Sequence, residues 1–162
     1  MYPFTLVTDS TIDETAAYFS QNDIKCVPLS FTIDNRTIEE DCGQTVSFHQ
    51  FYDLLRQGKQ SSTSQAKLDT FLTVFREALD AGPDVLYIGF SSGLSGTFQA
   101  GCMARDELAP LYPDRKIFCV DSLSATGGEY LLVDKAREMR DSGCTAEITA
   151  TAIEQMRLHV IH

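Results

Sequence analysis

The sequence predicts an α/β protein whose mainly parallel sheet is flanked by helices. Short runs rich in β-branched and aromatic residues alternate along the chain with segments of helical periodicity, as they do in α/β folds. Residues 85–90 form a nearly continuous apolar run, which is typical of a strand covered by helices on both faces. The 162 residues are enough for one substantial core but too few for two ordinary domains.

The first part of the chain contains a predicted strand, a helix and two extended segments. Residues 4–8 form the first strand, and Thr11 with Glu14 makes the T-x-x-E pattern of a capping box, which predicts a helix reaching about residue 20. Residues 25–33 are a second extended run. Residues 36–40 are expected to return beside it, because the Asp-Asn pair between the two runs favours a turn.

Two helices are predicted in the middle of the chain. Ser47 and Gln50 form another capping box at the start of the first one. Its apolar residues, at helical spacing, are Phe48, Phe51, Tyr52 and Leu55. The polar residues 58–66 separate it from the second helix, which ends at Gly82 and Pro83. The apolar face of the second helix consists of Leu68, Phe71, Leu72, Phe75 and Leu79.

The last part of the chain continues the alternation. A glycine- and serine-rich turn at residues 91–96 opens a helix that ends near residue 110. Residues 116–120 form another buried strand, and helices follow at about 127–142 and 146–156. Residues 158–162 alternate apolar and polar side chains without a stop signal. This pattern predicts a strand just beginning, so we expect the chain to be truncated before a further domain.

The composition argues against several functional classes. A formal net charge of −10 disfavours nucleic-acid binding through a basic surface. The acidic balance indicates a solvated surface or, as the alternative, a docking face for a basic partner protein. No apolar run approaches the ~20 residues of a membrane helix, so no membrane insertion is expected. The N-terminus lacks the basic region of a signal peptide and is interpreted as a strand.

The cysteines indicate a reducing, cytoplasmic location and no metal site. There are five, and no two have the C-x-x-C spacing of a zinc or redox motif. Most are expected to be small buried hydrophobic residues. They are Cys26, Cys42, Cys102, Cys119 and Cys144.

Polar pairs follow three of the predicted strands. They are Asp9-Ser10, Ser91-Ser92 and Asp121-Ser122. Ligands of open α/β sheets bind outside the carboxyl ends of the strands, so these pairs suggest a shared crevice. The alternative is that they only cap the helices that follow, and the two interpretations are compatible.

The turn from Ser91 to Thr97 is the sharpest local feature. Its glycines allow the backbone to approach a ligand closely, and the N-terminus of the next helix offers free N–H groups to an anion. The lysine of a phosphate-binding loop is absent after Gly96, and so is the dinucleotide pattern G-x-G-x-x-G. The turn therefore suits a small, singly charged group better than a polyphosphate.

The same turn leaves a serine hydrolase open as the alternative function. Gly93-Leu94-Ser95-Gly96 nearly matches the nucleophile elbow G-x-S-x-G, but Thr97 stands where the last glycine is expected. A hydrolase also needs a base. The histidines are His49, His159 and His162. None of them is comfortably placed in the usual Ser…Asp…His order along the chain.

A second hydroxyl-rich cluster lies at residues 61–65, Ser-Ser-Thr-Ser-Gln. Its composition alone favours a flexible loop between two helices. Such a loop is also able to reach over the carboxyl ends of the strands and close a pocket.

Five short motifs in order resemble the DegV family across nearly the whole chain. They are Asp9-Ser10-Thr11, Pro28-Leu29, Thr63-Ser64-Gln65, Leu94-Ser95-Gly96-Thr97 with Gln99, and Val120-Asp121-Ser122. The resemblance implies a carrier made of two α/β domains with a long-chain fatty acid between them. This chain then corresponds to the N-terminal domain, residues 1–162, with the second domain absent. The resemblance also implies that such a carrier presents the acyl carboxylate to a fatty acid kinase and is not itself an enzyme.

The resemblance also implies the binding residues. The carboxylate-binding hydroxyls of the family correspond to Thr63 and Ser95, and Ser62 and Ser92 are plausible neighbours. Ala66 departs from the family, which usually has proline there, and this is expected to loosen the Thr63 loop. The ligand is the fatty acid itself, with no cofactor and no metal.

Overall fold

The computed structural model describes residues 2–161, whose strands form two separate sheets. The main sheet has the order β2-β1-β6-β7, and every neighbouring pair in it is parallel. Its strands are β1 (Phe4–Asp9), β2 (Ile24–Val27), β6 (Asp84–Gly89) and β7 (Ile117–Asp121). The α/β class and the mainly parallel sheet predicted from the sequence are therefore confirmed.

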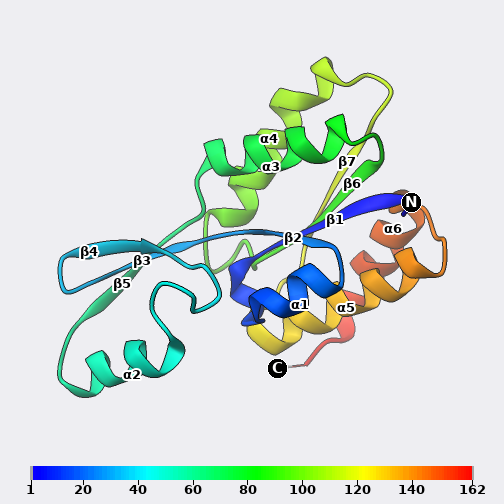
Figure 1. Ribbon diagram of the computed structural model, residues 1–162. Coiled ribbons are helices and arrows are strands. Elements are labelled where there is room, and N and C mark those ends of the chain that lie inside the picture. The colour runs from blue at the N-terminus through cyan, green and yellow to red at the C-terminus, as the bar shows by residue number, and fades with distance from the viewer. Residues whose placement is uncertain (1, 162) are drawn as a thin grey trace.

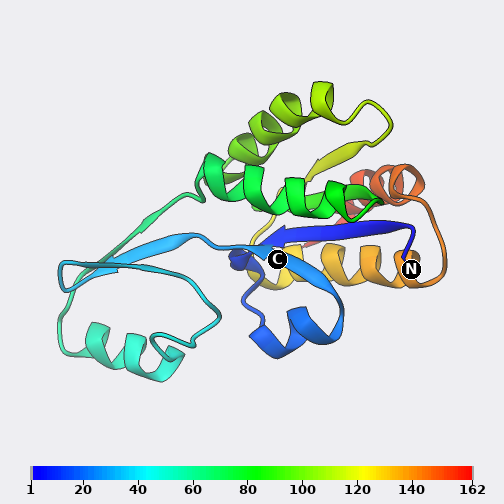
Figure 2. The same ribbon diagram turned by 45° about the horizontal axis from the view of Figure 1, so that its top comes forward.

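Helices cover both faces of the main sheet (Figures 1 and 2). The helices on one face are α1 (Ala16–Gln21), α5 (Thr126–Asp141) and α6 (Ala146–Met156). The helices on the other face are α3 (Leu68–Asp80) and α4 (Thr97–Leu108). Alternate side chains of β1 and β6 enter the two cores, with Leu6 and Leu86 on one side and Val7 and Tyr87 on the other. No helix within residues 2–161 is long and apolar enough to cross a membrane.

A small antiparallel sheet extends beyond the main sheet and was not predicted as a separate unit (Figure 1). Its strands are β3 (Ser30–Ile33), β4 (Arg36–Glu39) and β5 (Ser61–Ser64), in the order β4-β3-β5. Helix α2 (Phe48–Arg56) packs on it, and the ring of Phe51 lies edge-on to that of Phe31 with centroids 5.1 Å apart. The return of residues 36–40 beside the preceding strand and the Ser47–Gln50 capping box are both confirmed.

Two predicted segments of the first half are different in the structure. The run of residues 25–33 is not one strand, because it breaks at Pro28 and Leu29 into β2 of the main sheet and β3 of the small sheet. Residues 61–64 are not a loop: they pair antiparallel with β3 as strand β5. The sequence did not indicate this strand because its side chains are exposed hydroxyls. Strand β5 is held by backbone hydrogen bonds to its partner and not by burial of side chains.

Two predicted element ends are also wrong. Thr11 and Glu14 do not form a capping box, because Asp9 caps the short 3₁₀ helix η1 (Ser10–Ile12) and Thr15 caps α1. The chain turns between these helices at Asp13, whose backbone is left-handed with φ 57°. No strand begins at residues 158–161, since the 3₁₀ helix η3 (Arg157–His159) follows α6 there, and His162 lies outside the described residues. The 3₁₀ helix η2 (Ala109–Leu111) ends α4 near the predicted position.

Candidate functional site

The loops that follow β1, β6 and β7 meet at one edge of the main sheet, which we call the crest. Parallel strands bring their carboxyl ends to the same edge, and backbone bonds join the loops there. The N–H of Ser91 donates to the carbonyl of Ser124 at 3.0 Å, and the N–H of Ser122 donates to that of Gly89 at 3.0 Å. The three polar pairs predicted to share a crevice therefore do come together.

The crest side chains mostly brace neighbouring loops. Asp9 caps η1, as the capping alternative expects. The hydroxyl of Ser10, however, accepts a bond from the N–H of Leu29 at 3.1 Å, and Asp121 accepts one from the N–H of Ser92 at 3.2 Å. The hydroxyl of Ser122 donates to the carbonyl of Ser124 at 3.1 Å. Capping alone is thus not the main task of these pairs.

Asp9 is a buried carboxylate surrounded by donors. The N–H and the hydroxyl of Thr11 donate to Oδ1 at 3.2 and 2.6 Å. The Tyr87 hydroxyl and the N–H of Phe90 donate to Oδ2 at 2.8 and 2.9 Å. Burial raises the pKa of Asp9, and these bonds oppose that rise. Asp9 is accordingly the anchor of the loop that carries Ser10 and Thr11.

Glu129 of α5 lies beside this anchor and is fully buried. Its Oε2 is 2.6 Å from the Thr11 hydroxyl oxygen, which is also 2.6 Å from Oδ1 of Asp9. One hydroxyl has one proton to donate, so one of the two carboxyl groups must itself be protonated. Burial, followed by the charge of Asp9, raises the pKa of Glu129 to about 10. Glu129 is therefore the neutral acid, donating to Thr11, which donates to Asp9.

The turn that carries Ser95 is joined directly to the segment that carries Thr63. The Ser95 and Thr97 hydroxyl oxygens are 2.9 Å apart, and Thr97 also accepts a bond from the N–H of Ala66 at 3.2 Å. The amide of Gln65 lies against Gly96, in the space that a Cβ at this position would occupy. The two hydroxyl-bearing motifs thus meet, although they are about thirty residues apart in sequence.

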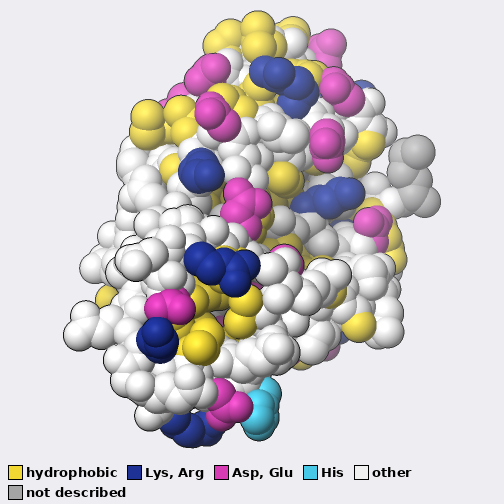
Figure 3. Space-filling model, turned by 60° about the vertical axis from the view of Figure 1, so that its left-hand side comes forward, with side chains coloured by type: hydrophobic (Ala, Val, Ile, Leu, Met, Phe, Trp, Pro, Cys, Tyr) yellow, Lys and Arg dark blue, Asp and Glu magenta, His cyan; other side chains and the backbone are white. Residues whose placement is uncertain are grey.

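Thr63 faces a hollow of about 260 Å³ between the small sheet, α2 and the crest. The apolar part of its lining is mostly aromatic: Phe31, Phe48, Phe51, Tyr52 and Val46. Among the described residues, the Thr63 hydroxyl makes no hydrogen bond and is free for a ligand. Figure 3, which brings the small sheet and α2 forward, shows hydrophobic side chains at the surface on this side, bordered by charged ones.

The polar lining of this hollow is hydroxylic and acidic. Ser10, Asp13 and Glu40 line it together with Thr63, and none of the described residues that line it is Lys or Arg. Burial raises the pKa of Asp13 and of Glu40, which shifts both toward their neutral forms. An anionic group held here would therefore be bound by hydroxyls and N–H groups without a neutralising cation.

The structure does not bring Ser62 to this hollow. Successive side chains of a strand point to opposite faces, and Ser62 lines a different depression on the other face of the small sheet, with Thr32 and Lys59. Ser92 lies exposed in the turn before Ser95. Of the two plausible neighbours, only Ser92 is on the same loop as a predicted binding residue.

Among the described residues, the Ser95 hydroxyl hydrogen bonds only with Thr97. Within residues 2–161 no histidine hydrogen bonds with Ser95. His49 instead contacts Asp53 at 2.9 Å and its side chain is 83% exposed on α2, whereas His159 lies in η3. The third histidine, His162, lies outside the described residues.

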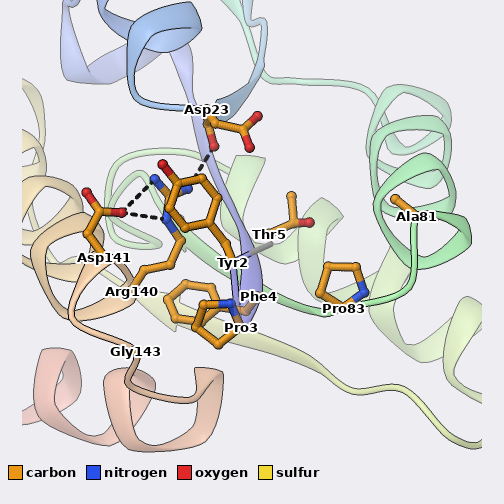
Figure 4. Close-up of a pocket in the computed structure, with 10 residues that line it drawn as sticks. All are labelled: Tyr2, Pro3, Phe4, Thr5, Asp23, Ala81, Pro83, Arg140, Asp141 and Gly143. Atoms are coloured by element: carbon orange, nitrogen blue, oxygen red, sulfur yellow. Dashed lines mark hydrogen bonds and ion pairs between the residues drawn. The ribbon is translucent and has the colours of Figure 1, made fainter.

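A larger hollow, of about 640 Å³, lies at the opposite end of the main sheet (Figure 4). Its cation, Arg140, is buried and already bound. The guanidinium donates to the carbonyls of Asn22 and Asp23 at 2.6 and 2.8 Å, contacts Asp141 at 3.2 Å and stacks on Tyr2. Arg140 thus ties the amino-terminal end of the sheet together, and we assign this hollow a structural role.

Comparisons with known proteins identify the family. The family model described as "Uncharacterised protein, DegV family" matches residues 3–162. The chain belongs to the DegV family. A DegV domain-containing protein of Streptococcus pyogenes serotype M1 is 36% identical over 162 residues, which cover 98% of this chain and 57% of the relative.

Solved DegV structures have the same fold. A DegV family protein from Thermus thermophilus, described by its fatty acid binding, aligns with a TM-score of 0.81 at 28% identity, over 96% of this chain and 54% of that one. A DegV lipid binding protein from Thermotoga maritima aligns with a TM-score of 0.82 at 26% identity, again over 96% and 54%. The chain therefore spans about half the length of the DegV proteins that it matches.

Sequence reasoning missed the parts of this DegV site that depend on distant packing. Glu129 and Tyr87 belong to helix and strand segments whose local patterns are unremarkable, yet both contact the Asp9 loop. The aromatic lining was visible only as the apolar face of a helix. The sequence did contain one indication of this lining. Phe48, Phe51 and Tyr52 lie on α2, a helix on which no side chain is fully buried. Within residues 2–161 no cluster of three or more His, Cys, Asp or Glu side chains is suited to a metal ion.

Proposed function

We propose that this DegV protein is a fatty-acid carrier that holds the acyl carboxylate with the hydroxyls of Thr63 and Ser95. The observation that carries the proposal is the junction of the two motifs, at Gln65 with Gly96 and at Ala66 with Thr97. This junction fixes the segments that carry the two hydroxyls to each other. The fatty acids and lipid bound by the Thermus and Thermotoga relatives support the same ligand class.

The aromatic hollow beside Thr63 supports a site for the acyl chain. Phe48 and Tyr52 are about half exposed, at 48% and 55%, although both line it. Apolar side chains that remain exposed around a concave surface favour an apolar ligand. Each methylene of an acyl chain buried against such side chains contributes ~0.8 kcal/mol, so the tail supplies most of the affinity.

The head-group chemistry suits a carboxylate that must later be released to another protein. Hydroxyls and the N-terminus of α4 stabilise an anion by hydrogen bonding but leave its charge unneutralised. Arg157 touches the crest, but its Nη1 donates to the carbonyl of Asp121 at 2.7 Å. We infer that the carrier presents the exposed carboxylate to a fatty acid kinase, as the family resemblance implies, and has no hydrolytic role of its own.

A titration with a fluorescent long-chain fatty acid tests the site. Replacing both hydroxyls, Thr63→Val with Ser95→Ala, removes two hydrogen bonds to an ionised group, each worth about 1.5–3 kcal/mol. We expect the affinity to fall at least about tenfold while the melting temperature changes little. Thr63→Val alone is the cleaner change, because Ser95 also contacts Thr97.

Ser62→Ala is the matched control, since Ser62 lies on the same strand but faces away from the hollow. Its affinity should equal that of the unmodified protein. Equal affinities for all variants would refute the assignment of Thr63 and Ser95. An equal loss of affinity with Ser62→Ala would show that the substitutions act by disturbing strand β5 and not by removing a hydroxyl from the ligand.

A further inference from the structure

Four of the five cysteines lie in two contacting pairs that the sequence spacing did not reveal. The thiol of Cys26 in β2 lies beside that of Cys42, which follows β4, and the thiol of Cys102 in α4 lies beside that of Cys119 in β7. All five cysteines are free thiols and partly exposed, which corrects the expectation that most of them are buried. Cys144 belongs to neither pair.

Cys102 and Cys119 are joined by the packing of α4 on the main sheet. Cys102 lies about one and a half turns after Thr97, the first residue of α4. Cys119 is in the middle of β7, an edge strand, on the face that α3 and α4 cover. Two rigid elements that pack on each other thus hold the two thiols near one another, and neither thiol depends on a loop for its position.

The surroundings favour a thiolate at Cys102. The hydrogen bond from the Cys119 thiol lowers the pKa of Cys102 to about 7, and the nearby Arg105 guanidinium acts in the same direction. Arg105 is itself held in place by Asp106, at 2.8 Å. The pKa of the Cys119 thiol is raised well above its usual value by the same hydrogen bond. The pair therefore consists of one thiolate and one thiol that donates to it.

We propose that Cys102 and Cys119 form a peroxide-sensitive dithiol, in which Cys102 is the nucleophile and Cys119 is the resolving thiol. The Cys102 thiolate attacks one oxygen of hydrogen peroxide, the O–O bond breaks, and a sulfenic acid and hydroxide form. The Cys119 sulfur then attacks the Cys102 sulfur, and the S–O bond breaks. Two thiols and one peroxide thus give one disulfide and two water molecules, with the thiols oxidised and the peroxide reduced.

The second pair provides an internal comparison. Cys42 also has a lowered pKa because Cys26 donates to it, but here Glu40 and Asp41 are the nearby charges and they oppose the thiolate. Cys102 has the Arg105 cation nearby in addition to two acids, Asp106 and Asp121, whereas the charges near Cys42 are the acids alone. We therefore expect the Cys102–Cys119 pair to oxidise first, although the two thiols of each pair are neighbours.

Mass spectrometry of the whole chain after limited peroxide treatment tests the proposal. The reduced protein is exposed to one equivalent of hydrogen peroxide near neutral pH, blocked with N-ethylmaleimide and digested. We expect a linked peptide containing Cys102 and Cys119 as the first product, with Cys144 fully alkylated. Brief alkylation without peroxide should label Cys102 roughly tenfold faster than an ordinary thiol, because about half of it is thiolate near pH 7.

Three variants separate the roles. With Cys119→Ser, the sulfenic acid on Cys102 should persist and be trapped by dimedone, whereas Cys102→Ser should leave Cys119 reduced. Arg105→Gln should slow the alkylation of Cys102 severalfold. Cys144→Ser should change nothing. The proposal is overturned if unmodified protein forms no Cys102–Cys119 link while other cysteines oxidise, or if Cys102 is alkylated no faster than Cys144. Both results come from the unmodified chain and do not depend on how any variant folds or on the ligand.

Discussion

At the scale of single residues, the crest is organised by the way two buried carboxyl groups share protons. Asp9 accepts four hydrogen bonds, whereas Glu129 keeps its proton and donates to Thr11. Thr8 completes the arrangement by donating to the other oxygen of Glu129 at 3.4 Å. This network fixes the loop on which Ser10 reaches the aromatic hollow.

Glu129→Gln tests whether the acid is neutral. The amide can donate to Thr11 and accept from Thr8 as the protonated acid does. In the unmodified protein the folded pKa is about 10 against an ordinary 4.5. The folded state therefore binds more protons above pH 4.5, and the free energy of unfolding falls as pH rises toward 10. In the Glu129→Gln variant, the free energy of unfolding should not show this fall with rising pH.

Urea unfolding at several pH values between about 5 and about 9 measures the difference. Glu138→Gln is the matched control, because Glu138 lies on the same helix but is exposed and pairs with Lys135. The control should keep the pH profile of the unmodified protein. Parallel profiles for Glu129→Gln and the unmodified protein would show that Glu129 is ionised when folded.

At the scale of elements, β6 depends on the absence of a side chain at Gly89. Tyr87 and Gly89 point to the same face of the strand, and the Tyr87 ring lies along it over Gly89. This position lets the hydroxyl reach Asp9. A Cβ on Gly89 would lie 2.2 Å from the Tyr87 oxygen and 2.4 Å from the adjacent ring carbon.

Gly89→Ala should therefore destabilise the protein by about 1–3 kcal/mol, because the rigid, buried ring has no room to move. Gly127→Ala is the matched control: it lies in α5, and a Cβ there meets nothing within 4 Å. The better helix propensity of alanine should stabilise that variant by up to about 1 kcal/mol. Thermal unfolding of both variants decides the matter, and a Gly89→Ala protein as stable as the unmodified one would contradict the packing described for Tyr87.

The elements also show how far the sequence alone reaches. The long amphipathic helix α3 and the buried strand β6 follow the predicted boundaries closely, because their patterns reflect burial directly. Strand β5 was missed because its four residues are exposed hydroxyl side chains, and backbone pairing with a distant strand leaves no hydrophobic pattern. The split at Pro28 was missed because both halves are extended and only their partners differ.

At the scale of the whole molecule, the predicted binding residues belong to two different units. Ser95 follows a strand of the main sheet, and Thr63 lies on the small sheet. Local motifs indicated both residues, but their relation depends on the contact of Gln65 with Gly96, which is a product of tertiary packing. The same packing separates Ser62 from Thr63, although the two are adjacent in sequence.

Exposed apolar side chains lie beside both predicted binding hydroxyls. Leu94, beside Ser95, is 67% exposed, and Leu123 lies exposed on the neighbouring crest loop. With Phe48 and Tyr52, these side chains place exposed apolar groups near both predicted hydroxyls. Under the proposed function, these side chains are available for apolar contacts with the acyl chain.

The central claim, that the fold binds a fatty acid through Thr63 and Ser95, is tested most directly by identifying what the purified protein carries. Organic extraction followed by mass spectrometry measures the bound acyl chains per protein, for the unmodified chain and for Thr63→Val with Ser95→Ala. The account predicts a long-chain fatty acid in the unmodified protein and at least about tenfold less in the double variant. Equal amounts in both proteins, or no acyl chain in either, would contradict it.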